Sequence, residues 1–160
     1  MPLAWGRERV VAALCRKIAA ARLEGLNVIE VWGDGEQTRS FCYIDDCGAG
    51  LHAAMHSDHS EPYNLGHDRI VSINELTRTI ADTAGMRVKA KHVDGPQGIR
   101  TCEVEHARVK AFPRWSAEIS LERGLRRTYK WIEQQVKEAA SEYSFGIATF
   151  RRPDLFDGDM

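Results

Sequence analysis

Apolar residues recur at helical spacing in three stretches of the chain, and each stretch predicts an amphipathic helix. The first spans Glu8–Leu23. The second follows Ser72, which forms a capping box with Glu75, and it stops at Gly85. The third begins after Ser120 and carries apolar residues over several turns. These three helices are the main structural prediction of the sequence.

Short runs of β-branched and aromatic residues predict strands between the helices. Val28–Trp32 and Thr38–Ile44 are two such runs, and the turn sequence Gly33–Gly35 separates them, so we expect a β-hairpin. Arg87–His92 alternates charged and less polar residues, as a half-exposed strand does. Pro62–Gly66 reads as a short buried strand that ends on its glycine.

Two further helices complete a mixed α/β fold. One is expected over Cys47–His56, with an N-cap from one of the two aspartates before it, and a short one over Glu103–Ala111. The whole is about five helices and a few short strands. We expect residues 1–140 to form one domain and residues 141–160 to be a loosely ordered tail.

Length and composition indicate a cytoplasmic, soluble domain. The chain has 160 residues, with 43% hydrophobic and 28% charged residues, which is ordinary for a globular protein. A net charge of −1 argues against a nucleic-acid partner, and no apolar run is long enough to span a membrane. The N-terminal residues lack the pattern of a secretion signal. Four cysteines at unrelated spacings are expected to be free thiols.

Arg39 is a permanent cation inside a predicted strand that should be half buried. A buried charge needs a partner of opposite sign, because leaving it unpaired is too costly. The partner could be a carboxylate of the chain or a phosphate, which a guanidinium grips with two hydrogen bonds. Arg7 and Arg9 add a hint of a phosphate, because the start of a helix attracts anions and disfavours cations.

The sequence shows no recognisable cofactor or metal site. It lacks the glycine patterns of a dinucleotide-binding turn or a P-loop, and it lacks Gly-x-Ser-x-Gly. His52 and His56 are spaced to share a metal, but His59 falls in a loop and no Cys-x-x-Cys supports them, so a polar helix face is favoured. Cys42 and Cys47 are expected to be small core residues rather than nucleophiles.

Taken together, the motifs resemble the C-terminal part of extended short-chain dehydrogenases/reductases of the NAD-dependent epimerase/dehydratase type, with GDP-mannose 3,5-epimerases as the nearest group. The likeness covers Trp5–Val136. The motifs that carry it are Gly6-Arg7-Glu8-Arg9, Trp32-Gly33-Asp34-Gly35, Gln37-Thr38-Arg39-Ser40-Phe41, Ile44-Asp45-Asp46, Pro62–Gly66, Val71–Leu76, Gly95–Arg100 and Gly124–Ile132.

The resemblance implies a division of labour between two halves. In such enzymes an N-terminal Rossmann half holds NAD and a catalytic Tyr-x-x-x-Lys pair, and the C-terminal half grips the nucleotide-diphosphate sugar. This chain would be a mixed α/β substrate domain without a complete Rossmann sheet and without a cofactor of its own. The implied substrate-binding residues are Glu8, Arg9, Val10, Lys17, Gln37, Thr38, Arg39, Ser40 and Arg100.

Catalysis by this chain alone is not expected. Arg9 stands where the family has an acid/base lysine, and a guanidinium does not release its proton at working pH. Arg39 and Arg100 are expected to face a pyrophosphate of a GDP-mannose-like ligand. The alternative is a stand-alone binding or interaction module that pairs through a sheet edge at Pro62–Gly66. A separate Rossmann-half chain and self-association are the two candidate partnerships.

Overall fold

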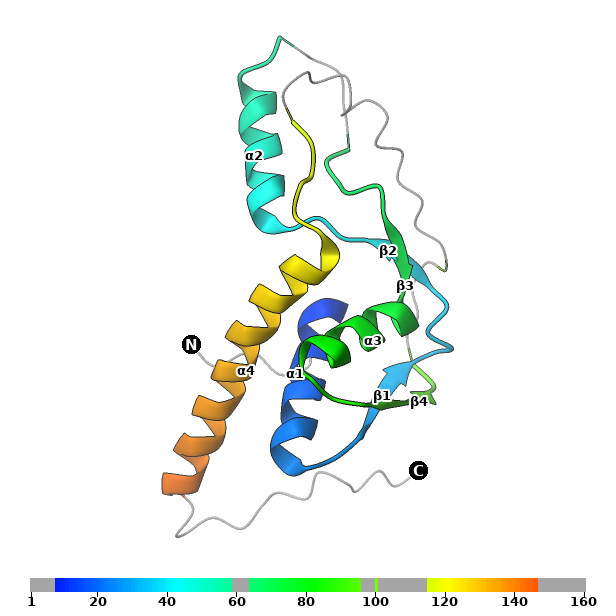
Figure 1. The fold of residues 1–160 in the computed structure, drawn as a ribbon, viewed down its shortest axis with the longest axis vertical. Helices are drawn as coiled ribbons and strands as arrows, with labels where there is room; N and C mark the ends of the chain where they lie inside the picture. The colour runs from blue at the N-terminus through cyan, green and yellow to red at the C-terminus, as the bar shows by residue number, and fades with distance from the viewer. Residues whose placement is uncertain (1–7, 59–63, 96–99, 101–114, 147–160) are drawn as a thin grey trace.

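The computed structural model describes residues 8–58, 64–95, 100 and 115–146 (Figure 1). The helices are α1 (Val10–Glu24), α2 (Ile44–Met55), α3 (Ile73–Thr83) and α4 (Leu121–Gly146). The strands are β1 (Val28–Trp32), β2 (Thr38–Ser40), β3 (Ile70–Ser72) and β4 (Lys89–Val93). The expected mixed α/β fold without a complete Rossmann sheet is confirmed.

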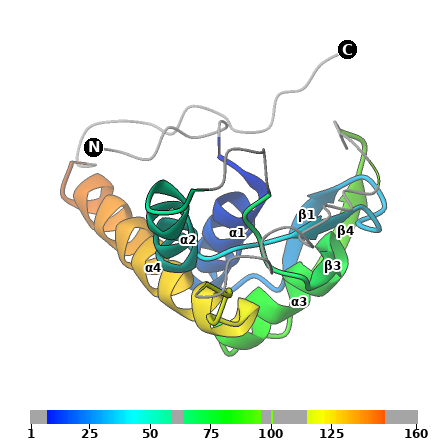
Figure 2. The same cartoon turned by 90° about the horizontal axis from the view of Figure 1, so that it is seen from above.

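The core lies where α1, α3 and α4 pack against one another (Figures 1 and 2). Ile18 of α1, Leu76 of α3 and Ile132 of α4 are 0%, 0% and 2% exposed. Ile29 and Val31 of β1 add their side chains to the same cluster. The apolar stripes that predicted these three helices therefore meet in one core.

The predicted hairpin is wrong. β1 pairs in parallel with β4, with Val28 opposite Lys89, and β2 pairs antiparallel with β3. The turn between β1 and β2 is instead held by the start of α3. The N–H of Asn74 donates to the carbonyl of Gly35 at 3.0 Å, and the N–H of Ile73 donates to the carbonyl of Gln37 at 3.1 Å. These bonds carry the chain from one two-stranded sheet to the other, so the strands do not fold back on each other.

The end of α1 and the start of α3 lie where the sequence predicted them, whereas the N-cap of α2 differs from the prediction. Gly25 ends α1 with φ +69°, and the hydroxyl of Ser72 caps α3 by accepting from the N–H of Glu75 at 3.1 Å. α2 begins at Ile44, and neither aspartate is its N-cap. The carboxylate of Asp46 accepts instead from the N–H of Ile119 at 2.8 Å. This hydrogen bond anchors the segment before α4 to α2.

Several other expectations change or lie outside the described residues. Residues 64–66 are not a strand, while Pro62, Tyr63 and the expected helix Glu103–Ala111 lie outside the described part. α4 continues to Gly146, beyond the point at Ser141 where its pattern ends in the sequence. Cys42 and Cys47 are half-buried, at the link into α2 and in its first turn, rather than in the core.

Replacing the capping hydroxyl of Ser72 by alanine should lower the free energy of unfolding by about 1 kcal/mol, because the N–H of Glu75 loses its acceptor. Urea unfolding followed by circular dichroism measures the difference. Ser72→Thr keeps the oxygen and suits the adjoining strand, so it should retain most of the stability. Equal stability of Ser72→Ala and the unaltered chain would contradict the capping role.

Candidate functional site

A cavity of about 320 Å³ opens beside the N-terminal end of α1, between that helix, β1 and the start of β2. Its size is within the range of small-molecule pockets. Four cations and two carboxylates contribute to its lining, so positive charge predominates. These charged residues are Arg9, Arg16, Lys17, Arg39, Glu8 and Glu30.

The start of α1 brings free backbone donors to this cavity. Arg9 is the N-cap and makes no side-chain capping bond, and the first turn contains no acidic residue. The first amide to bond back is that of Ala13, which donates to the carbonyl of Arg9 at 2.9 Å. The partial positive charge at this helix end favours an anion.

Arg39 reaches the cavity from β2 without a carboxylate partner in the described part of the chain. It is half-buried, and its Nη1 donates to the carbonyl of Thr38 at 2.6 Å. Arg16 differs, because its Nε lies 2.6 Å from Oε1 of Glu8, and both side chains are largely buried. The charge of Arg16 is therefore balanced within the protein, whereas among the described residues no carboxylate balances the charge of Arg39.

Lys17 is held at the cavity by neutral groups. Its Nζ donates to the carbonyl of Glu30 at 2.7 Å and lies 6.0 Å from the centre of the Trp32 ring. Partial burial lowers the pKa of Lys17, and the nearby charge of Glu30 opposes that shift. A partly desolvated ammonium of this kind gains from an approaching anion.

Gln37 connects the cavity wall to β1. The side chain is 7% exposed, and its Nε2 donates to the carbonyl of Trp32 at 3.2 Å. Its Oε1 is buried and has no hydrogen-bond partner among the residues that the structure describes. Buried acceptors without a partner are few in native proteins, so this oxygen marks the cavity as a place where a donor could still be accommodated.

Six of the nine residues singled out from the sequence line this cavity, and three do not. The six are Glu8, Arg9, Val10, Lys17, Gln37 and Arg39. Thr38 and Ser40 flank Arg39 along β2, where successive side chains alternate, and the hydroxyl of Ser40 donates to the carbonyl of His67. Arg100 is 68% exposed and lies 3.0 Å from Oδ2 of Asp34. The guanidinium of Arg100 thus has a carboxylate partner outside the cavity.

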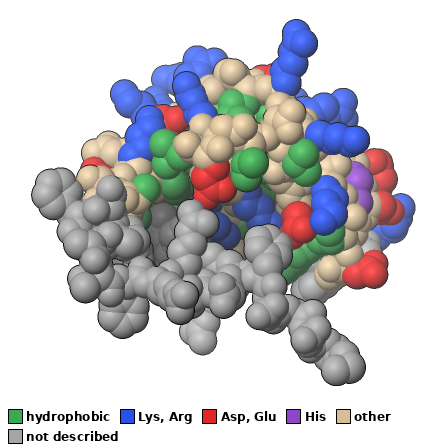
Figure 3. All heavy atoms as spheres, turned by 90° about the horizontal axis from the view of Figure 1, so that it is seen from below, with side chains coloured by type: hydrophobic (Ala, Val, Ile, Leu, Met, Phe, Trp, Pro, Cys, Tyr) green, Lys and Arg blue, Asp and Glu red, His purple; other side chains and the backbone are tan. Residues whose placement is uncertain are grey.

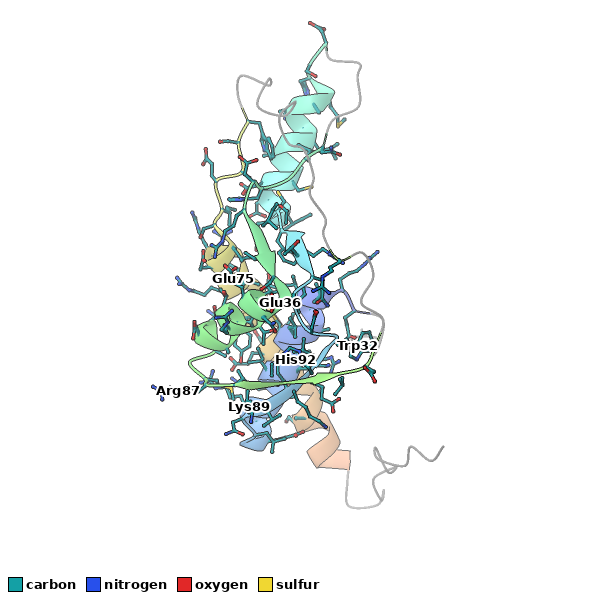
Figure 4. The ribbon with its side chains drawn as sticks, turned by 90° about the vertical axis from the view of Figure 1, so that its right-hand side faces the viewer. Trp32, Glu36, Glu75, Arg87, Lys89 and His92 are labelled. Carbon is teal, nitrogen blue, oxygen red and sulfur yellow. The ribbon has the colours of Figure 1, made fainter. Side chains whose placement is uncertain are left out.

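The sequence did not predict seven of the lining residues, which are Ala13, Leu14, Arg16, Glu30, Val31, Trp32 and Ile73, and Trp32 is the largest of them. It is the last residue of β1, and its side chain is 52% exposed (Figure 4). β1 alternates exposed and buried residues, with Glu30 and Trp32 on the exposed side. A large aromatic residue on the outward face of a strand, directly before a glycine turn, was the available signal.

The described residues contain no metal centre, and burial disfavours the thiolate forms of Cys15 and Cys42. Among them, no group of three or more potential ligands could hold a metal ion. The rings of His52 and His56 lie 4.3 Å apart, and Nδ1 of His56 is 2.9 Å from the carbonyl of His52. Burial raises the pKa of the Cys15 thiol to about 12 and also raises that of Cys42, which opposes thiolate formation.

The distribution of surface charge bears on a nucleic-acid partner, and the length and apolar character of the helices bear on a membrane. Figure 3 shows Lys and Arg side chains along the upper rim of one face, with acidic and hydrophobic side chains among and below them. This mixture fits the net charge of −1. In the part of the chain that the structure describes, no helix combines the length and the apolar character that crossing a bilayer requires.

Comparison with known proteins identifies the family. Residues 5–66 match the model of the NAD dependent epimerase/dehydratase family. GDP-mannose 3,5-epimerase from Arabidopsis thaliana is 36% identical over 87% of this chain and 36% of its own length. UDP-glucuronate 4-epimerase from Thermodesulfobacterium geofontis is 30% identical over 68% of this chain and 34% of its own.

Solved structures of related enzymes share the fold. UDP-glucose 4-epimerase from Thermotoga maritima, determined with UDP-glucose, superposes with a TM-score of 0.71 at 25% identity over 82% of this chain and 41% of that one. UDP-glucuronic acid 4-epimerase from Bacillus cereus, in complex with UDP-glucuronic acid and NAD, gives 0.67 at 28% identity over 80% and 41%. The chain spans about 36% of the length of the Arabidopsis relative. With these matches, the chain belongs to the NAD dependent epimerase/dehydratase family.

Proposed function

We propose that this chain is the nucleotide-sugar-binding part of an NAD-dependent sugar epimerase, and that its ligand is a GDP-mannose-like nucleotide-diphosphate sugar. The observation that carries the proposal is the position of Arg39 in the cavity lining. Arg39 is half-buried beside the N-terminal end of α1 and pairs with no carboxylate in the described residues. A diphosphate supplies the anion that both groups favour.

The other lining residues suit the remaining parts of such a ligand. Lys17 lines the same cavity as Arg39 and can balance the second phosphate charge. The exposed ring of Trp32 offers a flat surface on which a nucleobase can stack. The cavity of about 320 Å³ is open enough for the nucleotide, and the sugar would extend out of it.

The proposal assigns binding to this chain and not the redox chemistry of the family. In a dinucleotide site, a strand leads through a glycine turn directly into a helix. Here the glycine turn after β1 leads into β2, and the glycines with φ +72° serve that connection. The described residues contain no such strand–turn–helix, and the guanidinium of Arg9 does not release its proton at working pH, so we assign neither NAD binding nor the acid/base step to this chain. In a complete enzyme of the family, NAD would be held by the part of the protein that lies outside the region matched by this chain.

Calorimetric titration with GDP-mannose tests the proposal. We expect saturable binding by this chain, with mannose and with GMP each binding more weakly, because neither carries the diphosphate. A separate activity assay then mixes this chain with GDP-mannose, NAD and an NAD-binding half supplied as a second chain, and measures epimerisation of the sugar. Epimerisation only on mixing supports the split enzyme, whereas binding without rescued activity supports a stand-alone binding module. Failure to bind GDP-mannose at millimolar concentration would reject both.

Replacing Trp32 by alanine should weaken GDP-mannose binding by about tenfold, because stacking on an aromatic ring contributes about 1–3 kcal/mol per base. Calorimetry gives the affinity, and mannose 1-phosphate should bind both proteins equally, since it has no base. Trp131→Ala is the matched control. That tryptophan is 56% exposed on α4 and does not line the cavity. Equal losses for the two variants would argue against stacking at Trp32.

A further inference from the structure

Arg16 and Glu8 form a largely buried ion pair in the wall of the cavity. Nε of Arg16 lies 2.6 Å from Oε1 of Glu8, and the two side chains are 16% and 9% exposed. Both residues line the cavity. Taking two opposite charges out of water is costly, and apolar residues of similar volume often replace such a pair without loss of stability. Stability alone therefore does not account for this pair.

The fold fixes the two members of the pair to different degrees. Arg16 lies in the second turn of α1, between Cys15 and Ile18, which are both 0% exposed in the core. Glu8 precedes the N-cap Arg9, whose side chain makes no capping bond. The hydrogen bonds of α1 therefore do not set the position of Glu8, and the contact with Arg16 ties its carboxylate to a helix that the core holds.

The charges of the lining explain why Glu8 needs this partner. A carboxylate beside a diphosphate is repelled by it, and the nearby guanidinium of Arg16 cancels that repulsion. The other three cations of the lining, Arg9, Lys17 and Arg39, remain for the diphosphate. An ionised carboxylate only accepts hydrogen bonds, and it has several acceptor positions, so the hydroxyl groups of a ligand suit it.

We propose that Arg16 is a positioning residue, which directs the carboxylate of Glu8 toward the hydroxyl groups of the sugar. The inference rests on the proposed function, because it takes a nucleotide-diphosphate sugar as the ligand. The order along α1 supports it. Lys17, whose Nζ lies 6.0 Å from the centre of the Trp32 ring, follows the N-cap of α1 by about 12 Å of helix. With the base on Trp32 and the diphosphate at the start of α1, the sugar lies on the side of Glu8.

Calorimetric titration with two ligands tests the proposal. GDP-mannose is compared with the methyl ester of GDP at its β-phosphate, which carries the same charge but no sugar. The ratio of the two affinities measures what the sugar contributes, and for the unaltered chain it should be at least about tenfold. Arg16→Met should remove most of this ratio, about tenfold, because the carboxylate of Glu8 loses its orientation. Arg16→Lys keeps a cation beside Glu8 and should retain part of it.

Arg22→Met is the matched control. Arg22 lies in the last turn of α1 outside the cavity lining, and its Nη1 is 3.1 Å from Oε1 of Glu133. This variant also loses an ion pair of α1, and the ratio of the two affinities should be that of the unaltered chain.

A double variant shows whether Arg16 acts through Glu8. Glu8→Gln alone should lower the ratio, and Arg16→Met added to it should change the ratio by less than about twofold, because the group on which Arg16 acts is already altered. The double variant leaves neither charge without its partner, so it should fold even if Arg16→Met alone does not.

The possible results separate this inference from the proposed function. Equal losses for both ligands in Arg16→Met would show that Arg16 contacts the diphosphate or only supports the fold, and would overturn the positioning role. Equal affinities of the unaltered chain for the two ligands, or a further fall of the ratio in the double variant, would overturn it as well. In each of these cases the proposed function stands, because GDP-mannose binds. If the unaltered chain binds neither ligand, the proposed function fails and the positioning role fails with it.

Discussion

Alanine in place of Arg39 should weaken the affinity of this chain for GDP-mannose by about 100-fold, or about 2.7 kcal/mol. The guanidinium of Arg39 lines the cavity, and its one described bond, to the carbonyl of Thr38, uses Nη1. Its other N–H groups would donate to the diphosphate, and alanine removes both the charge and the fork. Calorimetric titration against GDP-mannose measures the loss.

The stability of the Arg39→Ala variant separates a ligand role from a structural one. Because Arg39 pairs with no described carboxylate, its removal should change the free energy of unfolding by less than about 1 kcal/mol. Arg39→Lys keeps the charge without the fork and should retain an intermediate affinity. Arg87→Ala is the charge-matched control, because Arg87 is exposed before β4, at the end of that strand remote from Trp32 (Figure 4). A large loss of stability with unchanged affinity would show that Arg39 is structural.

The parts of the fold that the sequence predicted correctly are those with a local cause. The capping box at Ser72 and Glu75 fixes the start of α3, because donor and acceptor are three residues apart. Gly85 follows the end of α3 with φ +65°, as its position in the pattern indicated. The apolar stripes of α1 and α4 are equally local, and they meet in the core through Ile18 and Ile132.

The errors concern interactions between residues far apart in the chain. The turn after β1 is compatible with a hairpin, and hydrogen bonds to residues far along the chain, among them the amides at the start of α3, direct it elsewhere. The pairing of β1 with β4 joins Val28 to Lys89, which no local pattern specifies. Asp46 looked like a cap because aspartate suits that position, but Ile119 competes for its carboxylate.

The candidate site was predicted in part for the same reason. An arginine in a half-buried strand predicts an anionic partner without deciding between a carboxylate and a ligand, and for Arg39 the structure shows no described carboxylate. The contact between Arg100 and Asp34 depends on where two turns meet, so the sequence could not reveal it. The nucleotide-sugar assignment itself came from the family's motifs and stays a proposal.

Replacing Gly35 by alanine should lower the free energy of unfolding by about 3 kcal/mol, for two reasons that add. Gly35 has φ +72°, a conformation that costs an L-residue about 1 kcal/mol or more. An added Cβ would also meet the side chain of Asn74, with its carboxamide carbon 2.5 Å away. Moving that side chain breaks its hydrogen bonds to the carbonyl of Asp34 and to Glu36, at 3.0 and 2.7 Å. Urea unfolding measures the loss.

A second glycine and a double variant separate the two reasons. Gly25 has φ +69°, and a Cβ there would meet nothing within 4 Å, so Gly25→Ala should cost only the conformational part, about 1 kcal/mol. In an Asn74→Ala background the clash is absent, and the further cost of Gly35→Ala should fall to the value found at Gly25. If Gly35→Ala costs no more than Gly25→Ala in the unaltered chain, Asn74 does not hold this turn. Because the same turn leads into Gln37 and Arg39, a loosened turn should also weaken GDP-mannose binding in proportion to the stability lost.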